Sequence, residues 1–78
     1  MTYEKMREKT MEIMEEIRKE AASFDPDSVY HRIAMDEVAH CKRLLDGGFN
    51  ITDVKYVMGC TTSGKLHGLM KDFLPTNY

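Results

Sequence analysis

The chain has 78 residues, of which 42% are hydrophobic and 31% are charged, and its net charge is -2. A single domain of this length has a thin core that cannot wall off a deep substrate cleft, and its balanced composition argues against a disordered chain. The sequence contains no run of about 18 apolar residues, so it predicts neither a membrane span nor a secretion signal. We therefore expect one cytoplasmic domain over residues 1–78, without enzymatic activity and without contact to a membrane.

The first predicted element is a long amphipathic helix over residues 3–24. Its apolar positions recur at intervals of three and four, which places them on one helical face, while the other positions are densely charged. The spacing of positions 3, 6, 10, 13, 17, 20 and 24 also fits a heptad seam, so this helix either packs within the chain or joins two copies as a homodimer. The apolar face comprises Met6, Thr10, Ile13, Met14, Ile17, Ala21 and Phe24.

The second predicted helix begins at Asp25-Pro26. The Asp25 carboxylate is suited to cap free backbone N–H groups, and proline fits the first helical turn without losing a needed donor. Gly47 and Gly48 predict the end of this helix, because glycine adopts a left-handed cap without steric cost. Its apolar face is expected to comprise Val29, Tyr30, Ile33, Ala34, Val38, Cys41, Leu44 and Leu45.

Two shorter helices complete the predicted fold. Thr52 predicts the cap of a third helix that runs through Met58 and ends at Gly59. A fourth helix, capped by Thr61, Thr62 or Ser63, carries Leu66, Leu69, Met70 and Phe73 inward before Pro75 ends it. The expected fold is all-α: a compact, orthogonal bundle of about four helices, in which residues 3–24 form a supporting or dimerising helix and residues 26–73 form the core.

A stretch of about thirty residues carries the functional signal. Residues 42–71 read KRLLDGGFNITDVKYVMGCTTSGKLHGLMK. They contain an apolar pair at Leu44-Leu45, a glycine-aromatic turn at 47–49 and the start of a short helix at 51–54, followed by a turn at 59–61 and the segment 63–69. This order resembles the helix-turn-helix of resolvase-, transposase- and phage-regulator-type DNA-binding proteins. The resemblance implies a small DNA-binding regulatory protein with residues 52–73 as its two-helix reader, Gly59 in the turn and Cys60 as an inward apolar plug.

The resemblance also implies a set of DNA contacts. The hydroxyls at 61–63 would meet phosphates or base edges at the start of the reading helix, Lys65 and His67 would point outward, and the remaining basic residues would hold the backbone. The charge pattern agrees in sign, because residues 42–78 carry +2 and residues 1–41 carry -4. The predicted contacts with double-stranded DNA are Thr61, Thr62, Ser63, Lys65, His67, Lys71, Lys55, Lys42 and Arg43.

Other interpretations of the same residues remain open. The glycines and hydroxyls also suit plain punctuation between two core helices. The chain is alternatively a non-enzymatic protein-interaction module, a small inhibitor or adaptor that binds its partner through the acidic face of residues 4–20 or a methionine-bearing groove. A third interpretation gives Cys60 and His67 a catalytic role.

Three patterns typical of cofactor or metal sites are incomplete. The string GCTTSGKL at 59–66 fits a phosphate-binding loop until Leu66 stands where the magnesium-binding Ser or Thr is needed, and the chain offers no parallel sheet around it. The histidines and cysteines lack the paired close spacing of a zinc site, and the glutamates of the first helix lack the Glu-x-x-His pairs of di-metal bundles. We expect no cofactor and no metal.

Overall fold

The computed structural model of the chain describes residues 2–60 and 64–73, leaving aside the side chains at 72 and 73. These residues form four α-helices in the order α1 (Tyr3–Ala22), α2 (Val29–Asp46), α3 (Ile51–Cys60) and α4 (Gly64–Phe73), with no strand among them. The predicted all-α class and the compact bundle of about four helices are confirmed. None of the described helices has the length and the apolar content needed to cross a membrane.

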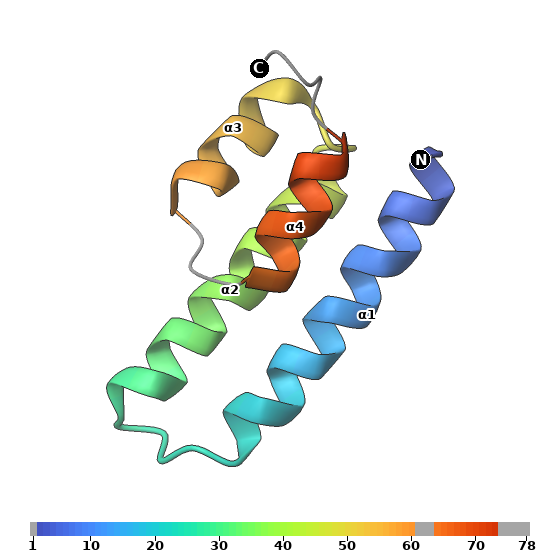
Figure 1. Cartoon of the computed structure of the whole chain (residues 1–78). Coiled ribbons are helices and arrows are strands. Elements are labelled where there is room, and N and C mark those ends of the chain that lie inside the picture. Colours follow the sequence, from blue (N-terminus) through green and yellow to red (C-terminus); the bar gives the residue numbers. More distant parts are fainter. Residues whose placement is uncertain (1, 61–63, 74–78) are drawn as a thin grey trace.

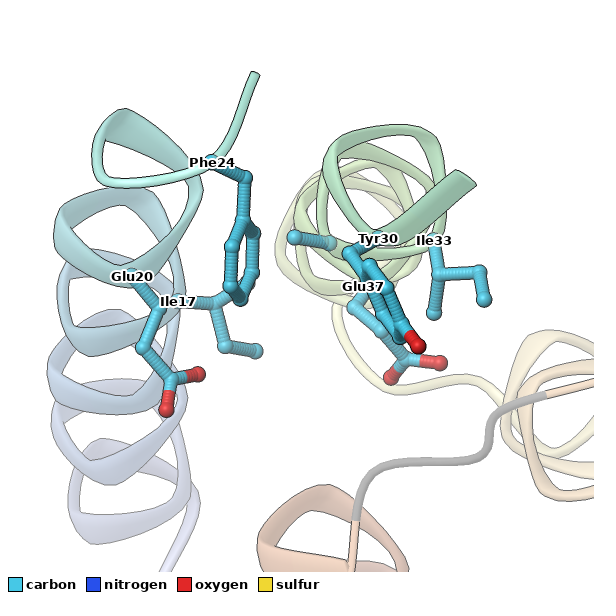
Figure 2. A pocket seen from close by; sticks show the side chains of 7 residues that line it. Ile17, Glu20, Phe24, Tyr30, Ile33 and Glu37 are labelled. Carbon is cyan, nitrogen blue, oxygen red and sulfur yellow. The ribbon is translucent and has the colours of Figure 1, made fainter. Parts of the chain in front are cut away.

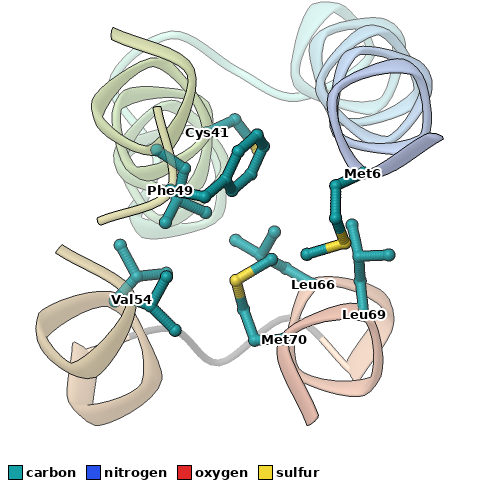
Figure 3. Close-up of a cluster of buried hydrophobic side chains, with 9 residues drawn as sticks. Met6, Cys41, Phe49, Val54, Leu66, Leu69 and Met70 are labelled. Carbon is teal, nitrogen blue, oxygen red and sulfur yellow. The ribbon is translucent and has the colours of Figure 1, made fainter. Parts of the chain in front are cut away.

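The four helices form two layers of unequal length. Helices α1 and α2 make a long antiparallel hairpin, and the shorter α3 and α4 lie against one half of it (Figure 1). Viewed close to end-on, α3 lies beside α2 and α4 lies beside α1, so the helices run roughly along one direction and do not cross as in the expected orthogonal arrangement (Figure 3). Helix α1 is therefore a full member of the bundle.

Helix α1 begins and ends close to its predicted bounds. The Thr2 side chain caps it by accepting a hydrogen bond from the backbone N–H of Lys5 at 3.2 Å. The buried Thr10 belongs to the apolar face because its hydroxyl donates to the carbonyl of Met6 at 2.8 Å, which satisfies the polar group inside the helix. Met6, Ile17 and Ala21 are buried as predicted.

Helix α2 begins at Val29, so its predicted start at Asp25-Pro26 is wrong. The Asp25 carboxylate accepts from the backbone N–H of Asp27 at 2.9 Å, which makes a local turn instead of a helix cap. The cap is Ser28, whose hydroxyl accepts from the backbone N–H of His31 at 3.2 Å.

The corner after α2 is closed by two reverse hydrogen bonds of the Schellman type. The N–H of Gly48 donates to the carbonyl of Leu45 at 3.3 Å, and the N–H of Phe49 donates to that of Leu44 at 2.9 Å. Gly48 has a φ of 64°, so the predicted left-handed cap lies at this glycine, whereas Gly47 stays in the right-handed region. Phe49, with a φ of 58°, is 3% exposed and packs in the core with Leu44.

Helix α3 is longer than predicted at both ends. Its start is set by Asn50, whose side-chain oxygen accepts from the backbone N–H of Asp53 at 2.9 Å, so Thr52 is not the cap. The predicted end at Gly59 is wrong, because the helix continues through Cys60. A helical glycine costs about 1 kcal/mol against alanine, which the burial of Val54 and Val57 in the preceding turns outweighs. The expected caps of α4 at Thr61, Thr62 and Ser63 lie outside the described residues.

The core consists of two clusters at the two ends of the hairpin. The larger cluster joins all four helices and includes Met6, Leu44, Val54, Leu66 and Met70, each with no exposed surface (Figure 3). Among residues 2–60 and 64–73, the smaller cluster consists of side chains of α1 and α2, and Ile13 and Met14 pack against both clusters. The buried members of the smaller cluster are Ile17, Ala21, Ala34 and Val38.

Candidate functional site

Lys65, a predicted DNA contact, lies in the first turn of α4 and faces α1. Its Nζ forms an ion pair and hydrogen bond with the carboxylate of Glu16. The hydrogen bond to Glu16 raises the pKa of Lys65, and the charges of Glu16 and Glu20 act in the same direction. The ammonium group expected at a DNA phosphate therefore sits beside the carboxylates of the first helix.

His67 is directed at α3. This half-buried ring donates from Nε2 to the backbone carbonyl of Met58 at 2.9 Å. Met58 lies in the last turn of α3, where carbonyl groups have no helical partner. His67 thus ties α4 to the end of α3, although the sequence predicted an outward side chain. Leu66 and Leu69 are buried in the core as predicted.

Arg43 belongs to a polar network at the corner between α2 and α3. Its Nε donates to Oδ1 of Asp53 at 3.0 Å, and its guanidinium carbon lies 4.1 Å from the centre of the Tyr56 ring. Asn50 donates to the second oxygen of Asp53 at 2.7 Å and to the carbonyl of Gly47 at 3.1 Å. A Cβ on Gly47 would come within 2.2 Å of the Asp53 carboxylate, so the network requires glycine there.

The other predicted DNA contacts are spread over three helices. Lys42 on α2, Lys55 on α3 and Lys71 on α4 are exposed. Lys65 and Lys71 point about 120° apart around α4, since successive helical residues turn by about 100°, so they do not share one face. Thr61, Thr62 and Ser63, with the link between α3 and α4, lie outside the described residues, and the helix-turn-helix remains a prediction.

The half of the hairpin that α3 and α4 leave uncovered contains an open groove with a volume of about 230 Å³. Ile17 at its inner end lies eleven positions after the core residue Met6, and Tyr30 lies fourteen positions before Leu44, so the groove continues the core face of the hairpin. Figure 2 shows side chains of both helices pointing to this side. The groove is lined by Ile17, Glu20, Phe24, Tyr30, Ile33, Ala34 and Glu37.

Large apolar side chains on this groove are exposed to solvent. Phe24 is 36% exposed, Ile33 is 43% and Tyr30 is 70% exposed, although the sequence predicted all three on core-facing stripes. Helical periodicity identifies the face on which a residue lies but not whether another element covers that face. The predicted helix lengths could have indicated this exposed surface, because two helices of about 7 and 12 residues cannot cover a hairpin of about 21 residues.

Two carboxylates flank the apolar lining. Glu20 lies on α1 and Glu37 on α2, and both point to the groove side in Figure 2. Glu20 is exposed, whereas Glu37 is only 5% exposed. The groove therefore combines exposed aromatic and aliphatic surface with negative charge, and one of its charges is shielded from solvent.

The two cysteines differ in their exposure to solvent. Cys41 has no exposed surface, and burial, with the nearby charge of Glu37, raises its pKa to about 11. Cys60 is exposed, so the predicted inward plug is wrong. Helix α3 continues past Gly59, and Cys60 lies on its exposed side.

We expect iodoacetamide at pH 8 to alkylate Cys60 rapidly and Cys41 at least about 100-fold more slowly, because the thiolate is the reactive form. Peptide mass spectrometry of timed samples checks this result, and alkylation of both thiols in denaturant is the control. Equal native rates would contradict the burial of Cys41.

The pKa of Cys41 is higher in the folded chain than the ordinary value of 9.0, so the folded chain keeps the thiol proton to a higher pH than the unfolded chain does. The free energy of unfolding should therefore fall as pH rises from 9 towards 11.

The described residues contain no group of three or more His, Cys, Asp or Glu side chains placed to hold a metal ion. Comparisons with protein-family models, with curated proteins and with solved structures found no match to this chain.

Proposed function

We propose that this chain is a non-enzymatic protein-interaction module of the adaptor or inhibitor kind, and that it binds a helix of its partner in the open groove of the α1–α2 hairpin. The observation that carries the proposal is the apolar groove itself, with Phe24, Tyr30 and Ile33 exposed along the continuation of the core face. Contiguous apolar surface of this kind marks interaction sites on small proteins.

A helical partner suits the shape of the site. At the other end of the hairpin, α3 and α4 cover the same face and complete a four-helix core. At the groove end, the described side chains of the cluster around Ile17 and Val38 come from α1 and α2. A docked helix would extend the second layer and remove apolar area from water at about 25 cal/mol per Å².

DNA binding has weaker support from the contacts. Lys65 pairs with Glu16, and Arg43 is held by Asp53 and Tyr56. A duplex approaching α4 would also meet the glutamates of α1, which repel phosphates. The exposed Lys42, Lys55 and Lys71 keep DNA binding as a competing hypothesis.

The interaction proposal predicts that partner capture depends on Tyr30. Immobilised wild-type protein is compared with Tyr30→Ser and with the matched control Tyr56→Ser, since both tyrosines are exposed on helices and only Tyr30 lines the groove. We expect the wild type and Tyr56→Ser to retain a partner protein that Tyr30→Ser does not retain. Mass spectrometry identifies the retained protein. Identical retention by all three would contradict a role for the groove.

The competing hypothesis has its own test. Fluorescence anisotropy of labelled mixed-sequence duplex DNA is followed at low and moderate salt, with Lys65→Ala and Lys71→Glu as variants. The interaction proposal predicts no salt-sensitive binding by the wild type. Binding whose salt slope corresponds to several phosphates, and which both variants reduce, would favour the helix-turn-helix interpretation instead.

A further inference from the structure

We propose that the groove selects a basic amphipathic helix, because its apolar floor lies beside the exposed carboxylate of Glu20 on α1, one helical turn after the Glu16 that pairs with Lys65. This inference rests on the proposed function and adds the chemistry of the partner. The docking segment is two to three turns long, presents apolar side chains at helical spacing, and carries a Lys or Arg beside them.

Helix α4 provides the internal template for such an occupant. It lies against α1 on the same side of the hairpin and buries Leu66, Leu69 and Met70 at the spacing of one helical face. Next to this apolar face, Lys65 pairs with Glu16 of α1. The covered half of the hairpin thus already binds a helix through apolar contacts and one flanking ammonium–carboxylate pair.

The groove repeats this arrangement one step further along α1. Glu20 follows Glu16 by four residues, so the two carboxylates lie one helical turn apart on the same side of α1. Ile17 and Phe24 supply the apolar contacts there, and they span roughly 10 Å along the helix axis. This length accommodates about two turns of a docked helix, beyond the point where α4 begins at Gly64.

Charge argues for a basic partner and against a second copy of this chain. In a two-fold dimer through the groove, the acidic groove of one copy would face the same acidic groove of the other copy as the interface loses water. Like charges that lose solvent repel strongly, and the exposed Glu20 of each copy would be enclosed in such an interface. A Lys or Arg beside the apolar face of the docked helix would instead form an ion pair with Glu20.

The test uses two labelled model peptides of about fourteen residues, long enough to form an amphipathic helix on binding. One peptide contains Leu and Lys at helical spacing, and the other has Glu in place of every Lys. Fluorescence anisotropy at about 0.15 M salt, which screens distant charges, measures binding to the full chain. We expect the Leu–Lys peptide to bind at least about tenfold more tightly than the Leu–Glu peptide.

Variants locate the binding surface. Glu20→Lys and Ile33→Ser should each weaken Leu–Lys binding by about tenfold, whereas the matched charge reversal Glu15→Lys, on another face of α1, should change it by less than about threefold. Glu15 is exposed outside the groove and pairs with Arg18. Because Glu20, Ile33 and Glu15 are all exposed, the variants are expected to fold, and circular dichroism verifies this.

Several outcomes would overturn the inference. Equal weakening by Glu20→Lys and Glu15→Lys would mean that the peptide is held by the acidic surface of α1 in general. Equal binding of both peptides, or no binding of either, would reject a basic occupant. A dimer mass by light scattering that Tyr30→Ser reduces to the monomer would assign the groove to a second copy. If the peptides fail while capture still depends on Tyr30, the partner chemistry is wrong and the interaction module stands.

Discussion

Replacing Leu66 by alanine is expected to lower the free energy of unfolding by about 3 kcal/mol. Leu66 has no exposed surface and belongs to the cluster that joins all four helices, so the substitution leaves a cavity in the core that holds α4. A domain of this size has a small total stability, and the midpoint of thermal unfolding should fall by roughly 10 °C or more. Urea titration followed by circular dichroism measures the change.

Two further substitutions control this prediction. Leu66→Met keeps most of the side-chain volume and should cost less than about 1.5 kcal/mol. Ile51→Ala removes a comparable aliphatic side chain that is 50% exposed at the start of α3, so its effect should be clearly smaller. If Leu66→Ala and Ile51→Ala shift the urea midpoint equally, the described packing of α4 against the hairpin is wrong.

Phe49→Ala is expected to destabilise the fold by about 3 to 5 kcal/mol, the range found for buried aromatic residues. The ring is 3% exposed, and it meets the Tyr3 ring edge-on with centroids 5.8 Å apart, so it links the start of α1 to the corner after α2. Alanine keeps the unfavourable φ of 58° while losing the packing that compensates for it. Thermal and urea unfolding of the two proteins measure the difference.

Phe49→Leu tests whether the filled volume or the ring contact with Tyr3 stabilises the corner. Leucine keeps the positive φ and restores much of the buried volume, so this variant should recover most of the lost stability. An equal loss in Phe49→Leu and Phe49→Ala would assign the effect to the contact with Tyr3 instead of to the filled volume. A loss below about 1 kcal/mol in Phe49→Ala would contradict the burial of the ring.

The helical content of this chain was predictable from local signals. The spacing of Met6, Thr10 and Ile17 predicts the buried face of α1, and the two glycines at 47 and 48 predict the end of α2. Such signals depend on helix periodicity and on the backbone freedom of glycine, which act over a few residues. The helix boundaries were less predictable, because several polar side chains compete for one cap, as Asp25 and Ser28 do before α2.

The partners of the basic side chains were not predictable from local signals. Lys65 pairs with Glu16, which lies 49 residues earlier, and Arg43 meets Asp53 and Tyr56 on the following helix. A resemblance over residues 42–71 contains no information about α1, so it could not reveal that a glutamate stands beside the predicted reading helix.

The sequence by itself determined that the chain forms four amphipathic helices around a small core, because periodicity and capping are local properties of the chain. Only the tertiary structure decided which apolar stripes are covered. Helices α3 and α4 are ten residues each, and they cover one end of the hairpin by packing against α2 and α1, respectively, so Tyr30 and Ile33 stay exposed beside Glu20 and Glu37. Burial depends on the elements that pack above a face, and that packing brings together residues far apart in the sequence.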